Sequence, residues 1–149
     1  MKAHRMTHSC WRFVLFIVCV VAAAGCGSDR PQVYPTQGKV VFADGKPVKL
    51  GTVELYSDEH KLSAVGTIRN NGSFLLGTFT TDDGAVAGRH RAIVTQMVIN
   101  DTMTKHVLDH GAPVDPLYGS YTTSPLEVII SGDGPNDITL TVEKAAPRK

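Results

Sequence analysis

Apolar side chains recur at every second position in short runs of this 149-residue chain, and this period constrains its fold more than any other feature. The clearest run is the last, where Ile138, Leu140 and Val142 alternate with acidic and hydroxyl residues. Such alternation is typical of a strand that buries one face and exposes the other. Six further runs have β character, at residues 38–42, 52–56, 64–69, 73–79, 89–99 and 126–130.

Turn residues separate these runs. Asn71-Gly72 lies between two of them, which predicts a β-hairpin formed by residues 64–69 and 73–79. The run at 89–99 is rich in β-branched residues and becomes apolar on both faces, so we expect it to be a central strand. The sequence contains no amphipathic helix pattern of any length. The whole pattern therefore predicts an all-β fold, a seven-stranded antiparallel β-sandwich.

The first 25 residues have the pattern of a secretory signal peptide. Lys2, Arg5 and Arg12 give a basic start without any acidic residue, and residues 13–24 are apolar throughout. An apolar run of about 12 residues spans only about 18 Å as a helix, which is short of the roughly 30 Å hydrocarbon core of a bilayer. We therefore expect residues 1–25 to be cleaved rather than to remain as a transmembrane helix.

A cysteine follows the leader directly. Cys10 and Cys19 lie within the leader, so Cys26 is the one cysteine of the expected mature chain. Residues 23–26, Ala-Ala-Gly-Cys, resemble the lipobox of bacterial lipoproteins, although Ala23 stands where Leu is usual. This resemblance implies that the Cys26 thiol is acylated and anchors the protein to a membrane, with the outer membrane favoured because Gly27 rather than Asp comes next. The alternative is an ordinary cleaved signal peptide with an incidental cysteine.

The expected mature chain is long enough for one domain. We expect residues 26–37 to be the lipidated cysteine and a tether, residues 38–144 to be the folded domain, and residues 145–149 to be a tail. The whole chain has 15 Lys and Arg residues, and removal of the leader leaves 12 of them, against 14 acidic residues. A chain without a basic excess is not expected to bind nucleic acid.

Several short motifs follow one another along the chain: Gly38-Lys39-Val40, Asp44-Gly45-Lys46-Pro47-Val48, Gly51-Thr52-Val53, Asn71-Gly72-Ser73-Phe74, Asp83-Gly84-Ala85, Gly88, Pro116-Leu117-Tyr118 and Thr123-Ser124-Pro125-Leu126. Their order resembles that of carboxypeptidase regulatory-like (transthyretin-like, prealbumin-like) domains, which occur in many small bacterial lipoproteins. The chain departs from that family at His90 and Ala92, where an aromatic residue and Val are usual. The resemblance implies a transthyretin-like or Ig-like sandwich with a non-catalytic role and no shared catalytic residues.

Histidines in the aperiodic stretch 100–123 raise the possibility of a metal site. His106 and His110 are four residues apart and could share a Zn²⁺ from one face of a helical turn, with a third ligand from His60 or His90. The segment lacks the Glu that a metalloprotease needs beside its first histidine, and Gly111 ends any helix at once. We favour solvated loop histidines and expect no metal or other cofactor.

Two acidic clusters and the serines were also weighed. Residues 82–84 and 133–137 are rich in the hard oxygen ligands that calcium prefers. Neither has the spacing of an EF-hand, and such residues are what β-turns require, so we interpret both as turns. Nucleophilic catalysis has little support because the sequence contains no Gly-x-Ser-x-Gly motif. We therefore expect no enzymatic activity.

Tyrosines in the long stretch suggest a different kind of site. Tyr118 and Tyr121 lie close together and could stack on sugar rings, whereas Trp11 is lost with the leader. The alternative is that both rings pack at the rim of the fold or form a tyrosine corner.

These observations predict a lipid-anchored protein of the cell envelope that acts as a non-catalytic binding or structural module. Its expected partners are the membrane, through the anchor, and an envelope protein or a glycan. The second hypothesis is a carbohydrate- or small-ligand-binding surface module that uses Tyr118 and Tyr121. The third is a metal-dependent hydrolase centred on His106 and His110.

Overall fold

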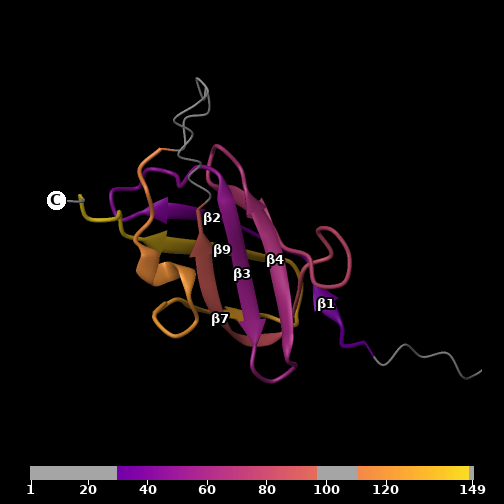
Figure 1. Ribbon diagram of the computed structural model, residues 1–149. Helices are drawn as coiled ribbons and strands as arrows, with labels where there is room; N and C mark the ends of the chain where they lie inside the picture. Colours follow the sequence, from indigo (N-terminus) through magenta and orange to yellow (C-terminus); the bar gives the residue numbers. More distant parts are fainter. Residues whose placement is uncertain (1–29, 97–110, 148–149) are drawn as a thin grey trace, which may run out of the picture. The chain divides into compact units, whose positions relative to one another are not determined.

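The structure is a computed structural model that describes residues 30–96 and 111–147. The chain divides into two units, Met1–Arg30 and Pro31–Lys149, and every described strand belongs to the second (Figure 1). This second unit is all-β, as the alternation predicts. Its elements are β1 (Val33–Tyr34), β2 (Thr36–Phe42), β3 (Gly51–Ser57), β4 (Leu62–Ile68), β5 (Ser73–Leu75), β6 (Ala85–Val86), β7 (Gly88–Thr95), the 3₁₀ helix η1 (Pro116–Gly119), β8 (Glu127–Ile130) and β9 (Asn136–Val142).

The described strands form three sheets. The largest has the order β4-β3-β7-β8 and is antiparallel throughout, and the second has the order β5-β2-β9. β7 is the longest strand and lies inside its sheet, which confirms the expected central strand as far as Thr95. The two-residue strands β1 and β6 pair separately and bring the described strands to nine, against the seven predicted.

One pairing differs from the antiparallel prediction. β2 and β9 run parallel in continuous register, from Thr36 opposite Asn136 to Phe42 opposite Val142. The two strands are far apart in the sequence, one near the start and one near the end of the folded unit. No tight turn joins them, so no turn fixes their relative direction. Side-chain alternation identifies the buried face of a strand and carries no information on the direction of its neighbour.

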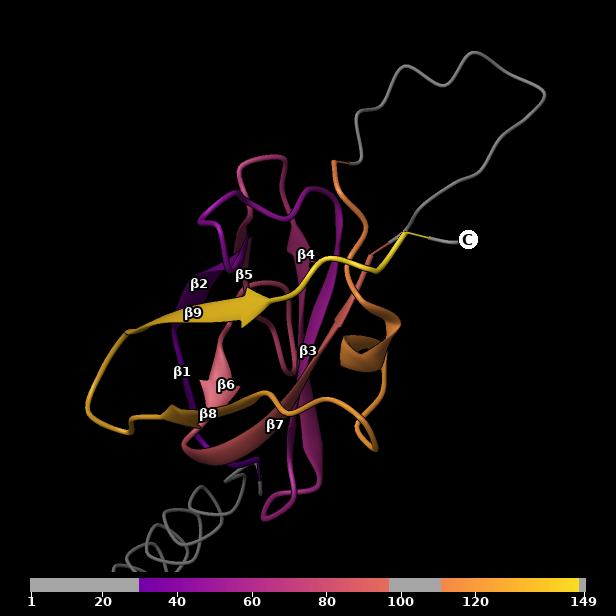
Figure 2. The same ribbon diagram turned by 90° about the vertical axis from the view of Figure 1, so that its left-hand side faces the viewer.

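The two larger sheets bury their apolar faces in one shared core. β2 and β9 run across the direction of β3 and β4 (Figures 1 and 2). In the early runs, the apolar residues that the alternation places on the inward face are at most 3% exposed, which confirms the assignment of their faces. They are Val40, Phe42, Val53, Leu55, Ile68, Phe74 and Leu76. The core includes Val40, Phe42, Val53, Leu55, Ile68, Phe74, Leu76, Ala92, Val94, Ile130, Leu140 and Val142.

The turn at residues 70–72 is correct, and the predicted hairpin forms in part, because Val65 of β4 and Gly77 form an antiparallel bridge. Gly72 has a φ of +80°, and the Arg69 N–H donates to the Ser73 carbonyl at 2.9 Å, so the chain does reverse there. The strands that it joins belong to different sheets, because β4 pairs with β3 and β5 pairs with β2. A tight turn fixes the local reversal of the chain, whereas the partner of each strand is set by packing over the whole core.

Two segments are more ordered than the sequence predicts. The expected tether overlaps β1 and the start of β2, and Val33 pairs with Val86 of β6, so the folded unit begins before Gly38. The part of the expected loop 100–123 that the structure describes is held by a bridge between Val114 and Lys144 and by η1. Residues 97–110 lie outside the described residues.

Candidate functional site

Several predicted site residues lie outside the described residues. These are the expected lipidation site Cys26 and the candidate metal ligands His106 and His110. In the part of the chain that the structure describes, no helix is both long enough and apolar enough to cross a membrane.

Tyr118 is a core residue. It lies on η1, where the Asp115 carboxylate caps the helix by accepting a hydrogen bond from the Leu117 N–H at 3.0 Å. The side chain of Tyr118 is 7% exposed and packs in the hydrophobic core. Its ring offers no free face to a sugar, so Tyr118 is not available as a stacking residue in a carbohydrate site.

Tyr121 packs on the outer face of the four-stranded sheet. Its ring lies 5.8 Å from that of Tyr56, centroid to centroid, and the rings are tilted by 54°. The Arg91 guanidinium carbon lies 5.2 Å from the Tyr121 centroid and 5.5 Å from the Tyr56 centroid, so it contacts both π systems. We call Tyr56, Arg91 and Tyr121, together with Asp58, the tyrosine–arginine cluster.

The strands and the segment after η1 position this cluster. Tyr56 on β3 lies directly opposite Arg91 on β7 in the antiparallel register. The segment that carries Tyr121 is fixed to β7, because the Ser124 hydroxyl donates to the Ala92 carbonyl at 2.6 Å and the Ala92 N–H donates to the Leu126 carbonyl at 2.9 Å. Sequence reasoning missed Tyr56 and Arg91, since each occupies a polar-face position whose neighbour depends on the register.

The charges of the cluster are paired with one another. Two nitrogens of Arg91 donate to the two oxygens of Asp58, each at 2.9 Å. This hydrogen bonding raises the pKa of Arg91 and lowers the pKa of Asp58. The pair is partly exposed, so it adds little stability by itself.

The hydroxyl of Tyr121 is buried and has no hydrogen-bond partner of good geometry in the described residues. Burial raises the pKa of Tyr121, and the charge of the nearby Glu54 carboxylate acts in the same direction. The phenol therefore stays neutral across the physiological range. Because its rings and charges contact one another, the cluster is suited to hold the 120–126 segment against the sheet.

His60 and His90, the candidate third ligands, are described, but the residues that they would join in a metal site, His106 and His110, lie outside the described residues. His90 is 1% exposed on β7, and its Nδ1 donates to the Gly88 carbonyl at 3.1 Å. Burial lowers the pKa of His90, while the hydrogen bond to Gly88 acts in the opposite direction and the charge of His60 lowers it further. His60 is exposed, and the described residues contain no group of three or more His, Cys, Asp or Glu side chains placed to hold a metal ion.

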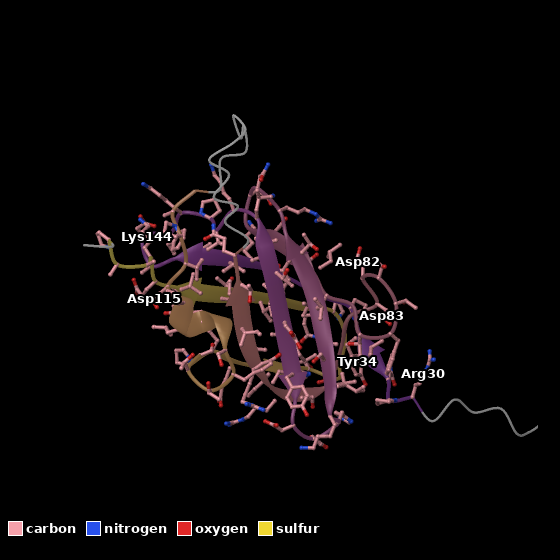
Figure 3. The ribbon with its side chains drawn as sticks, viewed as in Figure 1. Arg30, Tyr34, Asp82, Asp83, Asp115 and Lys144 are labelled. Carbon is pink, nitrogen blue, oxygen red and sulfur yellow. The ribbon has the colours of Figure 1, made fainter. Side chains whose placement is uncertain are left out.

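The two acidic clusters stabilise turns where the structure describes them. Asp83 accepts hydrogen bonds from the backbone N–H groups of Thr78 at 2.6 Å, Phe79 at 3.1 Å and Thr80 at 2.9 Å. Burial alone would raise the pKa of Asp83, but these three hydrogen bonds outweigh it and lower the pKa. Figure 3 shows Asp83 on the loop beside β4, at the far end of the unit from Lys144.

The second cluster folds in the same way around an amide. Asn136 accepts from the Ser131 N–H at 2.8 Å and donates to the Ser131 carbonyl at 3.2 Å and to the Gly134 carbonyl at 3.1 Å. These contacts favour the interpretation of residues 133–137 as a β-turn rather than as a calcium site.

A surface groove of about 540 Å³ follows the outer side of β4. It lies between Val65 and Thr67 of that strand and the loop that Asp83 organises, and Thr78 and Thr80 contribute to its wall. Val65 is 46% exposed there. The volume falls in the range of small-molecule sites, but the groove is open and carries no converging charged groups beyond Arg69 and Asp82.

Comparisons with protein-family models, with curated protein sequences and with solved structures find no match for this chain. The resemblance to carboxypeptidase regulatory-like domains therefore stays a prediction from the order of short motifs.

Proposed function

We propose that this protein is a lipid-anchored cell-envelope protein whose folded unit is a small β-sandwich that acts as a non-catalytic binding or structural module. The sandwich is supported by two sheets of three and four strands whose inward faces contribute to a single core. The lipid anchor is supported by the position of Cys26, directly after a basic and then apolar leader.

The single observation that carries the proposal is the spacing between Cys26 and the first strand. β1 begins at Val33, so six residues, 27–32, separate the cysteine from the folded unit. Six residues span at most about 20 Å when fully extended. Two or three acyl chains on Cys26 would anchor the protein stably at a membrane, since each buried methylene contributes about 0.8 kcal/mol. The folded unit would then work close to the lipid headgroups.

The proposal is tested by replacing the cysteine in the full-length chain. We expect Cys26→Ser to abolish incorporation of labelled palmitate and to move the protein from the membrane fraction to the soluble fraction, provided that the leader is still processed. Cys19→Ser is the matched control, because it removes a thiol within the leader and should leave both readouts unchanged. Equal labelling and equal membrane retention of the Cys26→Ser and wild-type proteins would refute the anchor.

A further inference from the structure

Among the described residues, no strand pairs with the outer edge of β9. β9 is the last strand of its sheet and pairs with β2 on one side (Figure 2). The backbone groups of its even-numbered residues face β2, since the Asn136 N–H donates to the Pro35 carbonyl at 2.8 Å and the Val142 carbonyl accepts from the Ala43 N–H at 3.2 Å. The N–H and C=O groups of the odd-numbered residues therefore point away from the sheet.

A contact at the end of the strand confirms this direction. The carbonyl of Glu143 accepts from the Asp115 N–H at 3.0 Å, and the residues around Asp115 cover the edge from that position onward. Between Asp137 and Thr141 no described residue forms a backbone hydrogen bond with the outer side of the strand. The free stretch is therefore five residues long, and it presents the backbone groups of Asp137, Thr139 and Thr141.

This edge carries few of the features that usually prevent strand association, and Asp137 is the one charged residue of β9. β9 contains no Pro, Lys or Arg, and its continuous register with β2 leaves no room for a bulge. The other described edges of the two large sheets are protected or short. A bridge from Gly77 to Val65 covers part of β4, β5 has three residues, and β8 has four.

The sequence of the edge suits a second copy of itself. In an antiparallel pair centred on Thr139, that residue lies opposite Thr139 of the second copy, and Asp137 lies opposite Thr141 of the second copy. The three outward residues of each strand then exchange six backbone hydrogen bonds, and no like charges face each other. A register centred on Asp137 would instead place two carboxylates opposite each other. A register centred on Thr141 would bring the second copy against the segment around Asp115, which already covers the edge at Glu143.

We propose that two copies of this protein associate by antiparallel pairing of β9 with β9 around a two-fold axis at Thr139. The pairing joins the two three-stranded sheets into one continuous sheet of six strands. The interface depends on backbone groups of β9 to which no described residue hydrogen-bonds, and it does not require the lipid anchor.

Charge substitutions at the two-fold axis test the proposal in the full-length protein. Two differently tagged copies are co-expressed, solubilised in mild detergent and purified through one tag, and the co-purified second copy is quantified. Thr139→Lys in both copies, or Thr139→Asp in both, places like charges opposite each other, and we expect the recovered second copy to fall about tenfold. Combining a Thr139→Lys copy with a Thr139→Asp copy should restore recovery.

Two variants separate this interface from a general loss of folding. Thr141→Pro removes an N–H that faces away from β2, so it should block the edge while leaving the β2–β9 ladder intact. Thr52→Lys places the same charge on an exposed position of the other sheet and should not change recovery. Failure of wild-type copies to co-purify, equal recovery for all charge combinations, or loss on Thr52→Lys would each overturn the proposal.

Discussion

The buried histidine on β7 should make the stability of the protein depend on pH. His90 faces the core between Ser57 of β3 and Val128 of β8, which lie opposite it in the two neighbouring strands. Burial lowers its pKa below the ordinary value of 6.5, and the nearby His60 opposes its protonation further. The folded protein therefore prefers the neutral ring, whereas the unfolded chain takes up a proton as the pH falls below about 6.5.

The sign and the limit of the effect follow from proton linkage. Because the unfolded state binds more protons than the folded state, the free energy of unfolding decreases as the pH falls, with a slope of at most about 1.4 kcal/mol per pH unit for one proton. If the folded state excludes the proton completely, the loss between pH 7.5 and 5.5 is about 1.4 kcal/mol. The loss stops at the lowered pKa of His90 in the folded state, where both states bind the proton.

The assay is urea unfolding between pH 5 and 8, followed by far-ultraviolet circular dichroism. We compare the wild type with His90→Phe, which keeps an aromatic ring, and with His90→Gln, which keeps a donor for the Gly88 carbonyl. Neither variant has a titratable side chain at position 90. The difference in unfolding free energy between the wild type and each variant should therefore change with pH. His60→Gln is the control, and it should keep most of the wild-type dependence because His60 is exposed.

A wild-type curve that runs parallel to both His90 variants from pH 5 to 8 would refute this reasoning. It would mean that the imidazole keeps its ordinary pKa in the folded state, through a partner or water that stabilises its charge. If the pH dependence of the unfolding free energy disappears in His60→Gln but persists in the His90 variants, His60 rather than His90 causes it.

Three further predictions concern the described fold. Gly38→Ala would overlap the Ile138 carbonyl oxygen of the β2–β9 ladder and should cost about 1–3 kcal/mol in urea unfolding, whereas Gly119→Ala faces open space and should cost little. Asp83→Ala should cost about 1–3 kcal/mol at pH 7, and the difference should fade as the pH drops through the lowered pKa of Asp83; a constant difference down to pH 2 would argue against the charged cap. Tyr121→Phe should leave the thermal midpoint unchanged or raise it, whereas Tyr121→Ala should lower it; equal losses would show that the hydroxyl has a partner.

The alternation of apolar residues predicts which face of a strand is buried, but it does not predict which strand pairs with it. Val40, Phe42, Leu140 and Val142 are buried as expected, because a period of two states which side of a strand meets the core. The same residues could pack in either strand direction, so the parallel β2–β9 pair was not predictable. The turn at residues 70–72 has the same limit, since it reverses the chain without choosing the sheet that receives β5.

The part of the stretch 100–123 that is described shows why absence of a period does not mean absence of structure. The segment around Val114 pairs with Lys144 through the backbone, and this kind of contact leaves no pattern in the side chains. The Gln96 side chain adds to it, accepting from the Val114 N–H and donating to the Lys49 carbonyl, each at 2.9 Å. A single amide that satisfies two distant backbone groups carries no periodic signal at all.

The tyrosine–arginine cluster combines both kinds of information. Tyr121 could be selected from the sequence because aromatic residues are few, and Tyr56 could be assigned to the wet face of its strand. Their contact required two long-range facts, the register that sets Tyr56 opposite Arg91 and the hydrogen bonds that fix the 120–126 segment to β7. An aromatic side chain can stack on a ligand or on a neighbouring side chain, and the sequence does not distinguish the two. Here the register of the strands brings Tyr121 into contact with Tyr56 and Arg91. This contact favours a structural role for the Tyr121 ring.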